Sequence, residues 1–433
     1  MKIWWQPTVR QLFGPRAVAL DALHGILRGR QNLDEAFNPA GMVDSDRAFA
    51  RLLLTTSLRR LGQVDALLDR VLQRHLPPNA APIQDILRMG IVQLLFLDIP
   101  PHAAVSTSVD LTKAIGFAGL APLVNGVLRH LDRDGRSWVK EQDAARLNTP
   151  DWLWDSWTAA YGAFPCRAIA TTHLIEPPLD ITVKRDPQVW ASSLNAVVLP
   201  TGTLRCKPGG PVTARNGYGL GAWWVQDAAA AIPARLLGAV AGRRIADLCA
   251  APGGKTAQLA SAGARVVAVD SSERRLKMLS TNMARLGLSV QQTLSDAAIW
   301  HPTEAMDGVL LDAPCSATGT LRRNPDVAHR RRPEDIAALT ATQDRLLEAA
   351  VRMLKRGGRL VYTTCSLQPE EGPERIARLL ESGAPLRRVR IEPAEVGGMA
   401  DLVNADGDLR TLPFHLAEKG GMDGFYAARL ERL

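Results

Sequence analysis

The sequence has 433 residues, of which 46% are hydrophobic and 22% are charged. A chain of this length exceeds the size at which one hydrophobic core keeps growing, so two or three domains are expected, and the composition excludes extensive disorder. The net charge of +8 favours an anionic partner, nucleic acid before a membrane surface, because a positive field speeds encounters with polyanions.

The sequence gives no indication of a membrane protein. The apolar stretch Ile91–Leu97 is far shorter than the roughly 18 residues that cross a bilayer. The segment Met1–Leu20 contains Arg10 and Arg16 but no acid, which leaves an organellar transit peptide open as an alternative. A secretory signal fits less well, because no continuous apolar stretch follows Lys2. We expect a cytoplasmic protein without a membrane partner, and a monomer.

The cysteines are single and widely spaced, at positions 166, 206, 249, 315 and 365. Their number is odd, and the sequence has neither paired CxxC spacing nor a His/Cys cluster, so we predict neither a disulfide framework nor a metal site. A single thiol of this kind is more often a small buried apolar residue than a reagent. The surroundings of each cysteine must therefore decide which of them react.

Residues 1–135 are predicted to form an all-α domain. Apolar residues follow helical spacing between Pro15 and Leu131, and the clearest run is Leu120, Leu123, Val124, Val127, Leu128 and Leu131. The pairs Pro77-Pro78 and Pro100-Pro101 interrupt this spacing and separate short helices. We expect a bundle of about five to seven helices.

Residues 136–220 are predicted to form a linker and a small α+β subdomain. The stretch Asp132–Pro165 is interpreted as a connector, whose tryptophans would form a docking surface between domains: Trp152, Trp154 and Trp157. After it, Leu179–Arg185 alternates apolar and polar residues, and the turn Lys207–Pro211 bounds further short strands.

In residues 221–433 strands and helices alternate, which predicts an α/β domain with a mostly parallel sheet covered on both faces. The expected strands are Arg244–Leu248, Arg265–Asp270, Val290–Asp296, Asp307–Asp312, Arg359–Thr364 and Gly424–Leu430. A helix over Ser272–Leu286 is expected to begin at Ser271 or Ser272 as N-cap and to end before Gly287. Another, over Pro333–Leu354, begins with a proline in its first turn.

A ligand-binding loop is predicted at Cys249–Thr256, between the first of these strands and a helix. Its small residues allow the backbone to approach a ligand, and the free amides at the helix start favour anionic groups. It matches neither GxGxxG nor GxxxxGK[ST]. Asp270, Asp296 and Asp312 end strands at the edge where open α/β sheets bind ligands, with Asp270 suited to ribose hydroxyls and Asp296 to an adenine amino group. Taken singly, each of these three acids could instead only cap the helix that follows it, and this alternative stays open.

Two cysteines are predicted to face the same crevice. Cys315 follows the strand that ends at Asp312, and Cys365 follows the strand that ends at Thr364. A thiolate can add to carbon 6 of cytosine and make carbon 5 nucleophilic, while a second thiol can assist release. Because only about a few per cent of an ordinary thiol is ionised at neutral pH, Lys255 or nearby arginines would have to activate it. A carboxyl at Asp312 that is protonated or shares a proton with the ring would stabilise the negative charge. Spacing alone does not decide which thiol attacks.

An arginine-rich segment follows Cys315, with Arg322, Arg323, Arg330, Arg331 and Arg332. Such a run is usually a solvated face, but beside the proposed site it is suited to phosphate contacts that position a strand. We interpret Arg322, Arg323 and Arg330 as RNA-binding. Since the reactive base must leave its stack to reach a buried thiol, single-stranded or loop RNA is the less costly substrate.

These motifs resemble the Sun family (also called Fmu) of RNA cytosine-C5 methyltransferases, and in detail the members that act on small-subunit rRNA. In the second half of the chain the matching motifs are Gln226-Asp227, Cys249–Thr256, Asp312–Ser316, Thr364–Ser366 and Asp423–Tyr426. In the first half they are Asp46–Phe49, Leu58-Arg59, Gln93–Leu97, Pro101–Val105 and Val124–Arg129. The match spans nearly the whole chain and is less clear in Pro187–Tyr218.

The resemblance implies an RNA-binding N-terminal domain similar to the antitermination factor NusB, and a Rossmann-like class I methyltransferase domain at 221–433. It implies S-adenosylmethionine as the cofactor, in contact with Cys249, Ala250, Ala251, Pro252, Gly253, Gly254, Lys255, Asp270, Asp296 and Asp312. It also implies methyl transfer to carbon 5 of a cytosine in 16S rRNA. By this resemblance the cysteine of the Thr-Cys-Ser motif, Cys365, is the nucleophile and Cys315 assists product release, with Asp312 as the third catalytic residue.

Other functions stay open beside this one. They are a noncatalytic RNA-binding or ribosome assembly factor, a tRNA cytosine-C5 methyltransferase, and a small-molecule or DNA methyltransferase. The presence of Cys315, Cys365 and Asp312 argues against the noncatalytic factor. The basic helical domain and the position of the Thr-Cys-Ser motif argue against the small-molecule and DNA enzymes.

Overall fold

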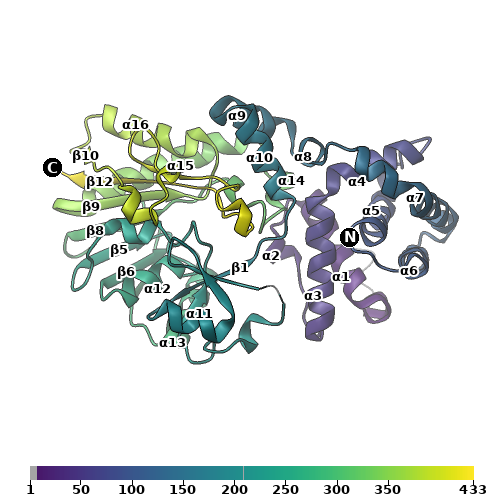
Figure 1. The fold of residues 1–433 in the computed structure, drawn as a ribbon, viewed down its shortest axis with the longest axis horizontal. Helices are drawn as coiled ribbons and strands as arrows, with labels where there is room; N and C mark the ends of the chain where they lie inside the picture. Colours follow the sequence, from purple (N-terminus) through teal and green to yellow (C-terminus); the bar gives the residue numbers. More distant parts are fainter. Residues whose placement is uncertain (1–6, 208) are drawn as a thin grey trace. The chain divides into compact units, whose positions relative to one another are not determined.

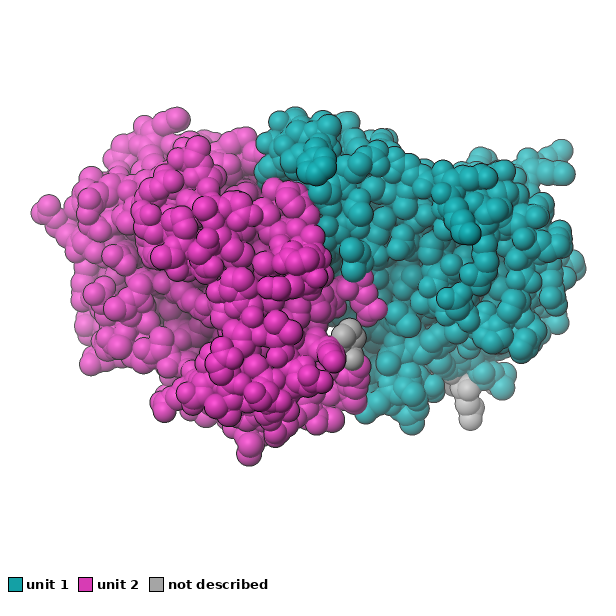
Figure 2. Space-filling model, viewed as in Figure 1, with its two compact units in different colours: residues 1–175, 321–331 teal, residues 176–320, 332–433 magenta. Residues whose placement is uncertain are grey.

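The computed structural model describes residues 7–207 and 209–433, which form two compact units (Figure 2). Unit 1 consists of residues 1–175 and 321–331, and unit 2 of residues 176–320 and 332–433. Residues 1–6 of the considered transit peptide and Pro208 of the predicted turn lie outside the described residues. The boundary at residue 175 differs from the predicted domain boundaries at 135 and 220, because helices beyond residue 135 belong to unit 1 and the small sheet belongs to unit 2.

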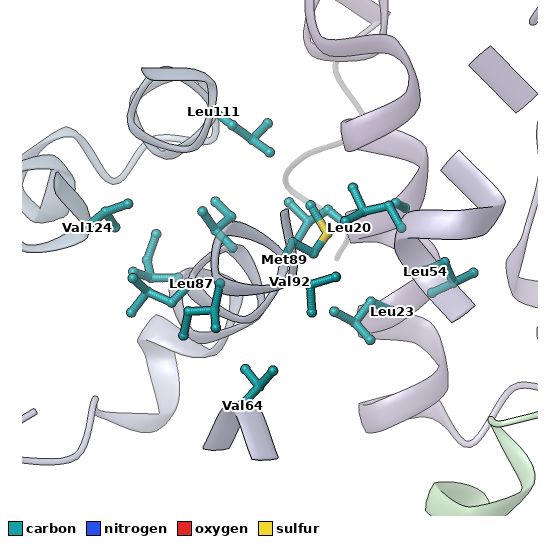
Figure 3. Close-up of a cluster of buried hydrophobic side chains, with 14 of the residues drawn as sticks. Leu20, Leu23, Leu54, Val64, Leu87, Met89, Val92, Leu111 and Val124 are labelled. Atoms are coloured by element: carbon teal, nitrogen blue, oxygen red, sulfur yellow. The ribbon is translucent and has the colours of Figure 1, made fainter. Parts of the chain in front are cut away.

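The bundle predicted between Pro15 and Leu131 is confirmed in unit 1. Within the described residues 7–141 the structure has seven α-helices: α1 (Pro7–Gly29), α2 (Leu33–Ala36), α3 (Asp44–Arg59), α4 (Leu61–Val71), α5 (Ala81–Leu95), α6 (Pro101–Ala114) and α7 (Ala121–Glu141). Helix α5 is buried on nearly all sides, and Figure 3 shows Leu87, Met89 and Val92 among side chains of neighbouring helices. A helix that is buried on nearly all sides forms the core of its bundle, and α5 does so although it also buries the paired charges of Asp85 and Arg88.

The connector predicted at Asp132–Pro165 is wrong. Helix α7 continues to Glu141, and α8 (Ala144–Leu147), α9 (Asp151–Tyr161) and α10 (Ala163–His173) follow. Leu153 and Trp157 are four positions apart and form the buried face of α9. Trp157 packs edge-on against the ring of His173, with 5.4 Å between ring centres, so it is a core residue of unit 1.

Unit 2 contains the predicted α/β domain. Its large sheet has the order β10-β12-β9-β8-β5-β6-β7, with β11 paired to β12 (Figure 1). The strands are β5 (Arg244–Leu248), β6 (Arg265–Asp270), β7 (Gln291–Leu294), β8 (Met306–Asp312), β9 (Leu354–Thr364), β10 (Leu386–Arg388), β11 (Leu409–Thr411) and β12 (Phe425–Arg432). Strands β5 to β9 pair in parallel, and β12 is antiparallel to its neighbours. Strands β5 and β6 have the predicted bounds, whereas β7 is shorter and β9 begins earlier.

Helices cover both faces of this sheet, as predicted. Helices α12 (Gly254–Ser261) and α13 (Glu273–Leu286) lie on one face, and α15 (Pro333–Met353) and α16 (Pro373–Glu381) lie on the other (Figure 1). Successive residues of a strand point to opposite faces, so Leu311 packs with α15 and α16 while Leu310 packs with α12. The predicted limits of α13 are confirmed, with Ser272 as its N-cap and Gly287 at its C-cap.

A small antiparallel sheet precedes the large one in unit 2. Its order is β2-β3-β1-β4, formed by β1 (Leu179–Val183), β2 (Ala196–Val198), β3 (Leu204–Cys206) and β4 (Trp223–Val225). Helix α11 (Pro187–Leu194) packs beside it, which agrees with the predicted α+β character of this region. The buried Arg205 guanidinium and Asp180 carboxylate form two hydrogen bonds, of 2.8 and 2.7 Å, between β3 and β1.

Two glycines inside helices of unit 1 are expected to respond oppositely to alanine. A Cβ on Gly62 in α4 would overlap the carbonyl oxygen of Leu147, whereas one on Gly126 in α7 would meet open space. Gly62→Ala should lower the free energy of unfolding by about 1–3 kcal/mol through overpacking, and Gly126→Ala should raise it by about 0.5–1 kcal/mol through helix propensity. Urea unfolding followed by circular dichroism measures both. A shift of the same sign in the two variants would contradict this packing.

Candidate active site

The predicted site residues follow strands whose C-terminal ends share one edge of the large sheet. Strand β5 pairs in parallel with β6 and β8, and β8 pairs in parallel with β9. In this register Asp312 lies opposite Thr363, and Leu248 lies opposite Leu311 and Val269. The chain runs from β5 to β6 and β7 on one side and returns at β8 on the other. The crevice beyond β5 and β8 is therefore the switch point at which open α/β sheets bind ligands.

The loop after β5 turns sharply into α12. Cys249 and Gly253 both have positive φ, of 60° and 103°. A Cβ on Gly253 would lie 3.0 Å from the Leu279 side chain, so backbone conformation and packing both favour glycine there. The Ala251 N–H donates to Asp270 Oδ2 over 3.1 Å and ties this loop to the end of β6.

A cavity of about 210 Å³ lies at these strand ends, and Cys249, Asp270, Asp296 and Pro314 contribute to its lining. It brings together residues from the ends of β5, β6, β7 and β8. The N-cap of the helix after β6 is Ser272 and not Asp270, so the helix-cap alternative does not describe Asp270. The Asp270 carboxylate instead accepts the backbone N–H groups of Ala251 and Ser272.

The structure brings the two predicted catalytic thiols into contact. Cys315 Sγ and Cys365 Sγ are 3.4 Å apart, and Cys315 is buried while Cys365 is half-buried. The hydrogen bond to Cys365, followed by burial, raises the pKa of the Cys315 thiol well above its ordinary value. Burial raises the pKa of Cys249 to about 12, so this thiol is neutral at physiological pH.

A buried ion pair stands beside the thiols. Lys255 Nζ lies 2.7 Å from Asp312 Oδ2, and the Lys255 side chain is only 9% exposed. Burial lowers the pKa of the Lys255 ammonium, but the Asp312 carboxylate outweighs this and raises the pKa overall, and negative charge on Cys365 acts in the same direction. Lys255 is therefore a cation whose field reaches Cys365.

One buried residue close to the thiols was missed from the sequence. Glu371 is fully buried and accepts hydrogen bonds from Ser316 and Ser366, which follow the two cysteines in the chain. It lies in the Pro369–Glu371 turn after β9, and an acid after a proline does not by itself indicate burial. The identical Cys-Ser pairing in the two loops was the available signal.

Four of the five arginines of the arginine-rich segment lie in residues 321–331 of unit 1, which include the short helix α14 (Val327–Arg330), whereas Arg332 belongs to unit 2. His329 Nε2 lies 2.7 Å from the Leu58 carbonyl oxygen, and the Arg59 guanidinium donates to the Arg322 carbonyl oxygen over 2.9 Å. The Arg30 guanidinium donates to the Arg330 carbonyl oxygen in the same way. These bonds attach the segment to α3 and to Arg30, the residue after α1.

The arginines predicted to bind RNA differ in exposure. Arg322 is fully buried, and its guanidinium offers no surface to a phosphate in this structure. Arg323 and Arg330 are half-buried, and Arg330 Nε donates to Asp326 Oδ2 over 2.8 Å. Sequence reasoning treated the run as one exposed face, because it could not show that the segment packs into a helical unit.

Two family models match this chain. One, described as "16S rRNA methyltransferase RsmB/F", matches residues 234–431, and the NusB family model matches residues 14–133. The ribosomal RNA small subunit methyltransferase B of Klebsiella pneumoniae is 35% identical, over 84% of this chain and 89% of its own length. The probable ribosomal RNA small subunit methyltransferase B of Synechocystis is 33% identical, over 92% and 94%. The chain belongs to the RsmB/F family of rRNA methyltransferases.

Membership in the RsmB/F family confirms the resemblance found in the sequence. Among solved structures, the crystal structure of PH0851 covers 97% of this chain and 98% of its own, with a TM-score of 0.77 at 23% identity. This likeness supports the fold over nearly the whole chain. A methyltransferase homologue from Pyrococcus horikoshii covers 64% of this chain, with a TM-score of 0.54 at 26% identity.

Two further features are absent from the described residues. No described helix is long and apolar enough to cross a membrane. Within residues 7–207 and 209–433, no group of three or more His, Cys, Asp or Glu side chains is arranged to hold a metal ion.

The buried Asp247 at the end of β5 is expected to make stability depend on pH. Burial raises its pKa to about 7, although the Thr256 hydroxyl bonds to its carboxylate. Because the folded-state pKa exceeds the unfolded one, this group stabilises the fold fully below about pH 4, and the contribution is lost as the pH rises through about 7. Asp247→Asn should remove that loss. The variant should therefore be more stable relative to the wild type at high pH. The difference in unfolding free energy, variant minus wild type, should be about 2–3 kcal/mol larger at about pH 8 than at about pH 5.

Urea unfolding of the RsmB/F-family enzyme at the two pH values tests this expectation. Asp186→Asn is the matched control, because Asp186 is exposed and has a left-handed backbone that asparagine accepts. A gain for Asp247→Asn that is equal at the two pH values would contradict the assignment.

Proposed function

We propose that this protein transfers a methyl group from S-adenosylmethionine to carbon 5 of a cytosine in 16S rRNA, through a covalent bond between Cys365 and the base. Membership in the RsmB/F family and the names of its relatives support the reaction class. The observation that carries the covalent mechanism is the pair of thiols 3.4 Å apart at the ends of β8 and β9, beside the Lys255–Asp312 ion pair.

The residues at the strand ends fit the proposed cofactor. S-adenosylmethionine would supply an electrophilic methyl group on a positively charged sulfur. Its ribose hydroxyls and adenine amino group are hydrogen-bond donors, and Asp270 and Asp296 offer acceptor oxygens at the 210 Å³ cavity. The loop Cys249–Lys255 would hold the rest of the cofactor, because Gly253 and Gly254 leave its backbone open to close approach. Asp312 would complete this set.

Cys365 would act as the nucleophile. Its thiolate adds to carbon 6 of the cytosine, so a carbon–sulfur bond forms and the ring electrons move to carbon 5, which then takes the methyl group. A base must next remove the proton from carbon 5, and the carbon–sulfur bond breaks to return the thiolate. The greater exposure of Cys365 and the nearby ammonium of Lys255 support this assignment over Cys315.

Cys315 would assist product release. Its raised pKa keeps it as a neutral thiol. A neutral thiol in contact with the attacking sulfur can exchange a proton with it or with the base as the covalent bond breaks.

Asp312 would stabilise the charge that attack drives into the ring, by sharing a proton with the nitrogen at position 3. Its side chain is 34% exposed, and one of its oxygens is held by Lys255. Unimpaired methyl transfer by an Asp312→Asn variant that binds the cofactor normally would contradict this role.

Arg323 and Arg330 would contact phosphates of the RNA, and the family's NusB-like helical domain would add RNA-binding surface. Their partial exposure supports such contacts, whereas the full burial of Arg322 gives no support for one there. Comparing labelled methyl transfer to 16S rRNA, tRNA and DNA tests the substrate class. Bisulfite sequencing of rRNA from cells with and without the protein identifies the cytosine.

Cys365→Ala should abolish methyl transfer, by about 10³-fold or more, because the ring is not activated without covalent attack. Transfer of labelled methyl groups to 16S rRNA measures this, and calorimetry should show nearly unchanged cofactor affinity. Cys206→Ala is the matched control, since Cys206 is buried in the small sheet away from the strand ends. Substantial residual transfer by Cys365→Ala would mean that the nucleophile is misassigned.

Cys315→Ala should trap the RNA on the protein, because the covalent bond forms but is released slowly. A denaturation-resistant band of lower mobility on a gel measures the adduct. The double variant Cys315→Ala/Cys365→Ala should lose the band, since the adduct depends on Cys365. Free turnover by Cys315→Ala without an adduct would remove Cys315 from the release step.

A further inference from the structure

A single buried carboxylate is bonded to both loops that carry the thiols. Glu371 Oε1 accepts the Ser316 N–H over 2.9 Å and Gln343 Nε2 over 3.1 Å. Its Oε2 accepts the hydroxyls of Ser316 over 2.5 Å and of Ser366 over 2.6 Å. All four donors are uncharged, and Glu371 is 0% exposed.

The two serines immediately follow the two cysteines in the chain, so their positions fix those of the thiols. The hydroxyls of Ser316 and Ser366 are 3.1 Å apart, and the Thr318 hydroxyl lies 3.3 Å from each. Thr318 also accepts the Leu367 N–H over 3.0 Å. The loops after β8 and β9 are thereby joined around one carboxylate, although 50 residues separate Cys315 from Cys365.

A second bond ties the same centre to α15. Gln343, which is fully buried in this helix, donates through Nε2 to the Pro314 carbonyl oxygen over 2.9 Å as well as to Glu371. The residue before Cys315 and the residue after it are therefore both held, Pro314 by Gln343 and Ser316 by Glu371.

Burying a carboxylate without a cation costs free energy, which these four hydrogen bonds offset. The hydroxyl and amide donors are uncharged, so none of these four bonds is an ion pair. Glu371 is among the causes that raise the pKa of Cys315, after the hydrogen bond to Cys365, burial and the charge of Cys365. Lys255 has the opposite sign and interacts with Cys365. A negatively charged group therefore acts on Cys315, and a positively charged group acts on Cys365.

We propose that Glu371 is a positioning residue that holds Cys315 and Cys365 at reacting distance through Ser316 and Ser366. The roles of the two thiols in this inference rest on the proposed function. The hydrogen bonds that place the two loops, and the raised pKa of Cys315, do not depend on the identity of the RNA.

Replacement of Glu371 by glutamine keeps the size of the side chain, removes its charge and turns one acceptor oxygen into a donor that faces other donors. Glu371→Gln should lower kcat for methyl transfer by about 100-fold, because small displacements of reacting groups cost rates of that order. KM for RNA and cofactor should stay within about threefold, since the residue does not contact either. Glu374→Gln is the matched control, an identical exchange at an exposed position of α16, and should retain wild-type kinetics.

A titration without RNA separates this inference from the proposed function. In protein labelled with carbon-13 at the cysteine Cβ, nuclear magnetic resonance follows each thiol, and Cys315→Ala assigns the signal. In Glu371→Gln the Cys315 signal should titrate about one pH unit lower than in the wild type, whereas a residue that only supports packing would not move it. If Cys365→Ala still methylates RNA, the covalent mechanism fails while this titration still reports on Glu371. A kcat within about threefold of the wild type, with an unchanged Cys315 titration, would overturn the inference.

Serine variants keep the inference testable if Glu371→Gln does not fold. Ser316→Ala and Ser366→Ala each remove one hydroxyl from the carboxylate and should each lower kcat by about 10-fold. The double variant should lose less than the product of the two effects, because both act through Glu371. Ser382→Ala, an exposed serine after α16, is the control. Wild-type kcat in both single variants would reject the positioning role.

Discussion

Strand β8 lies between β5 and β9 and pairs in parallel with both, and the arrangement of the site follows from this pairing. Parallel neighbours end at the same edge, so the cofactor loop after β5, the Cys315 loop after β8 and the Cys365 loop after β9 emerge together. The crossover from β8 to β9 requires a long connection, which α15 provides. The same helix contributes Gln343, which bonds to the Pro314 carbonyl oxygen in the Cys315 loop. Helix α15 therefore connects β8 to β9 in the chain and also holds the loop that follows β8.

Charge is distributed unevenly along this edge. Asp247, Asp270 and Asp312 come from the ends of three adjacent strands, and Lys255 is the cation paired with Asp312. An edge rich in acids suits a cofactor with a positively charged sulfur, which supports the proposed cofactor on grounds independent of sequence likeness. Lys255 is paired with Asp312, and its positive charge also interacts with Cys365.

The sequence predicted what depends on local pattern. The bounds of β5 and β6 and both ends of α13 follow from apolar runs, an N-cap serine and a C-terminal glycine, and the structure has them at these residues. The connector was wrong because α9 is short, and its two buried side chains, Leu153 and Trp157, give little periodic signal. Glu371 was missed because its function requires partners from three elements that meet only in the folded chain. The burial of Arg322 could not be foreseen for the same reason, since Arg59, which bonds to its carbonyl oxygen, comes from the distant helix α3.

The segment 321–331 makes unit 1 discontinuous in sequence, which limits when this unit can complete its folding during synthesis. His329 bonds to the Leu58 carbonyl oxygen across 271 residues, so the N-terminal helices emerge from the ribosome long before the eleven residues that complete them. About three quarters of the chain has been made when Arg331 appears, including β5 to β8 and the Cys315 loop. Domains generally fold as they are translated, N-terminal part first. Here the helical unit lacks residues 321–331 until strands β5 to β8 of the large sheet have been synthesised. The helical unit therefore completes its folding only after much of unit 2 has been made.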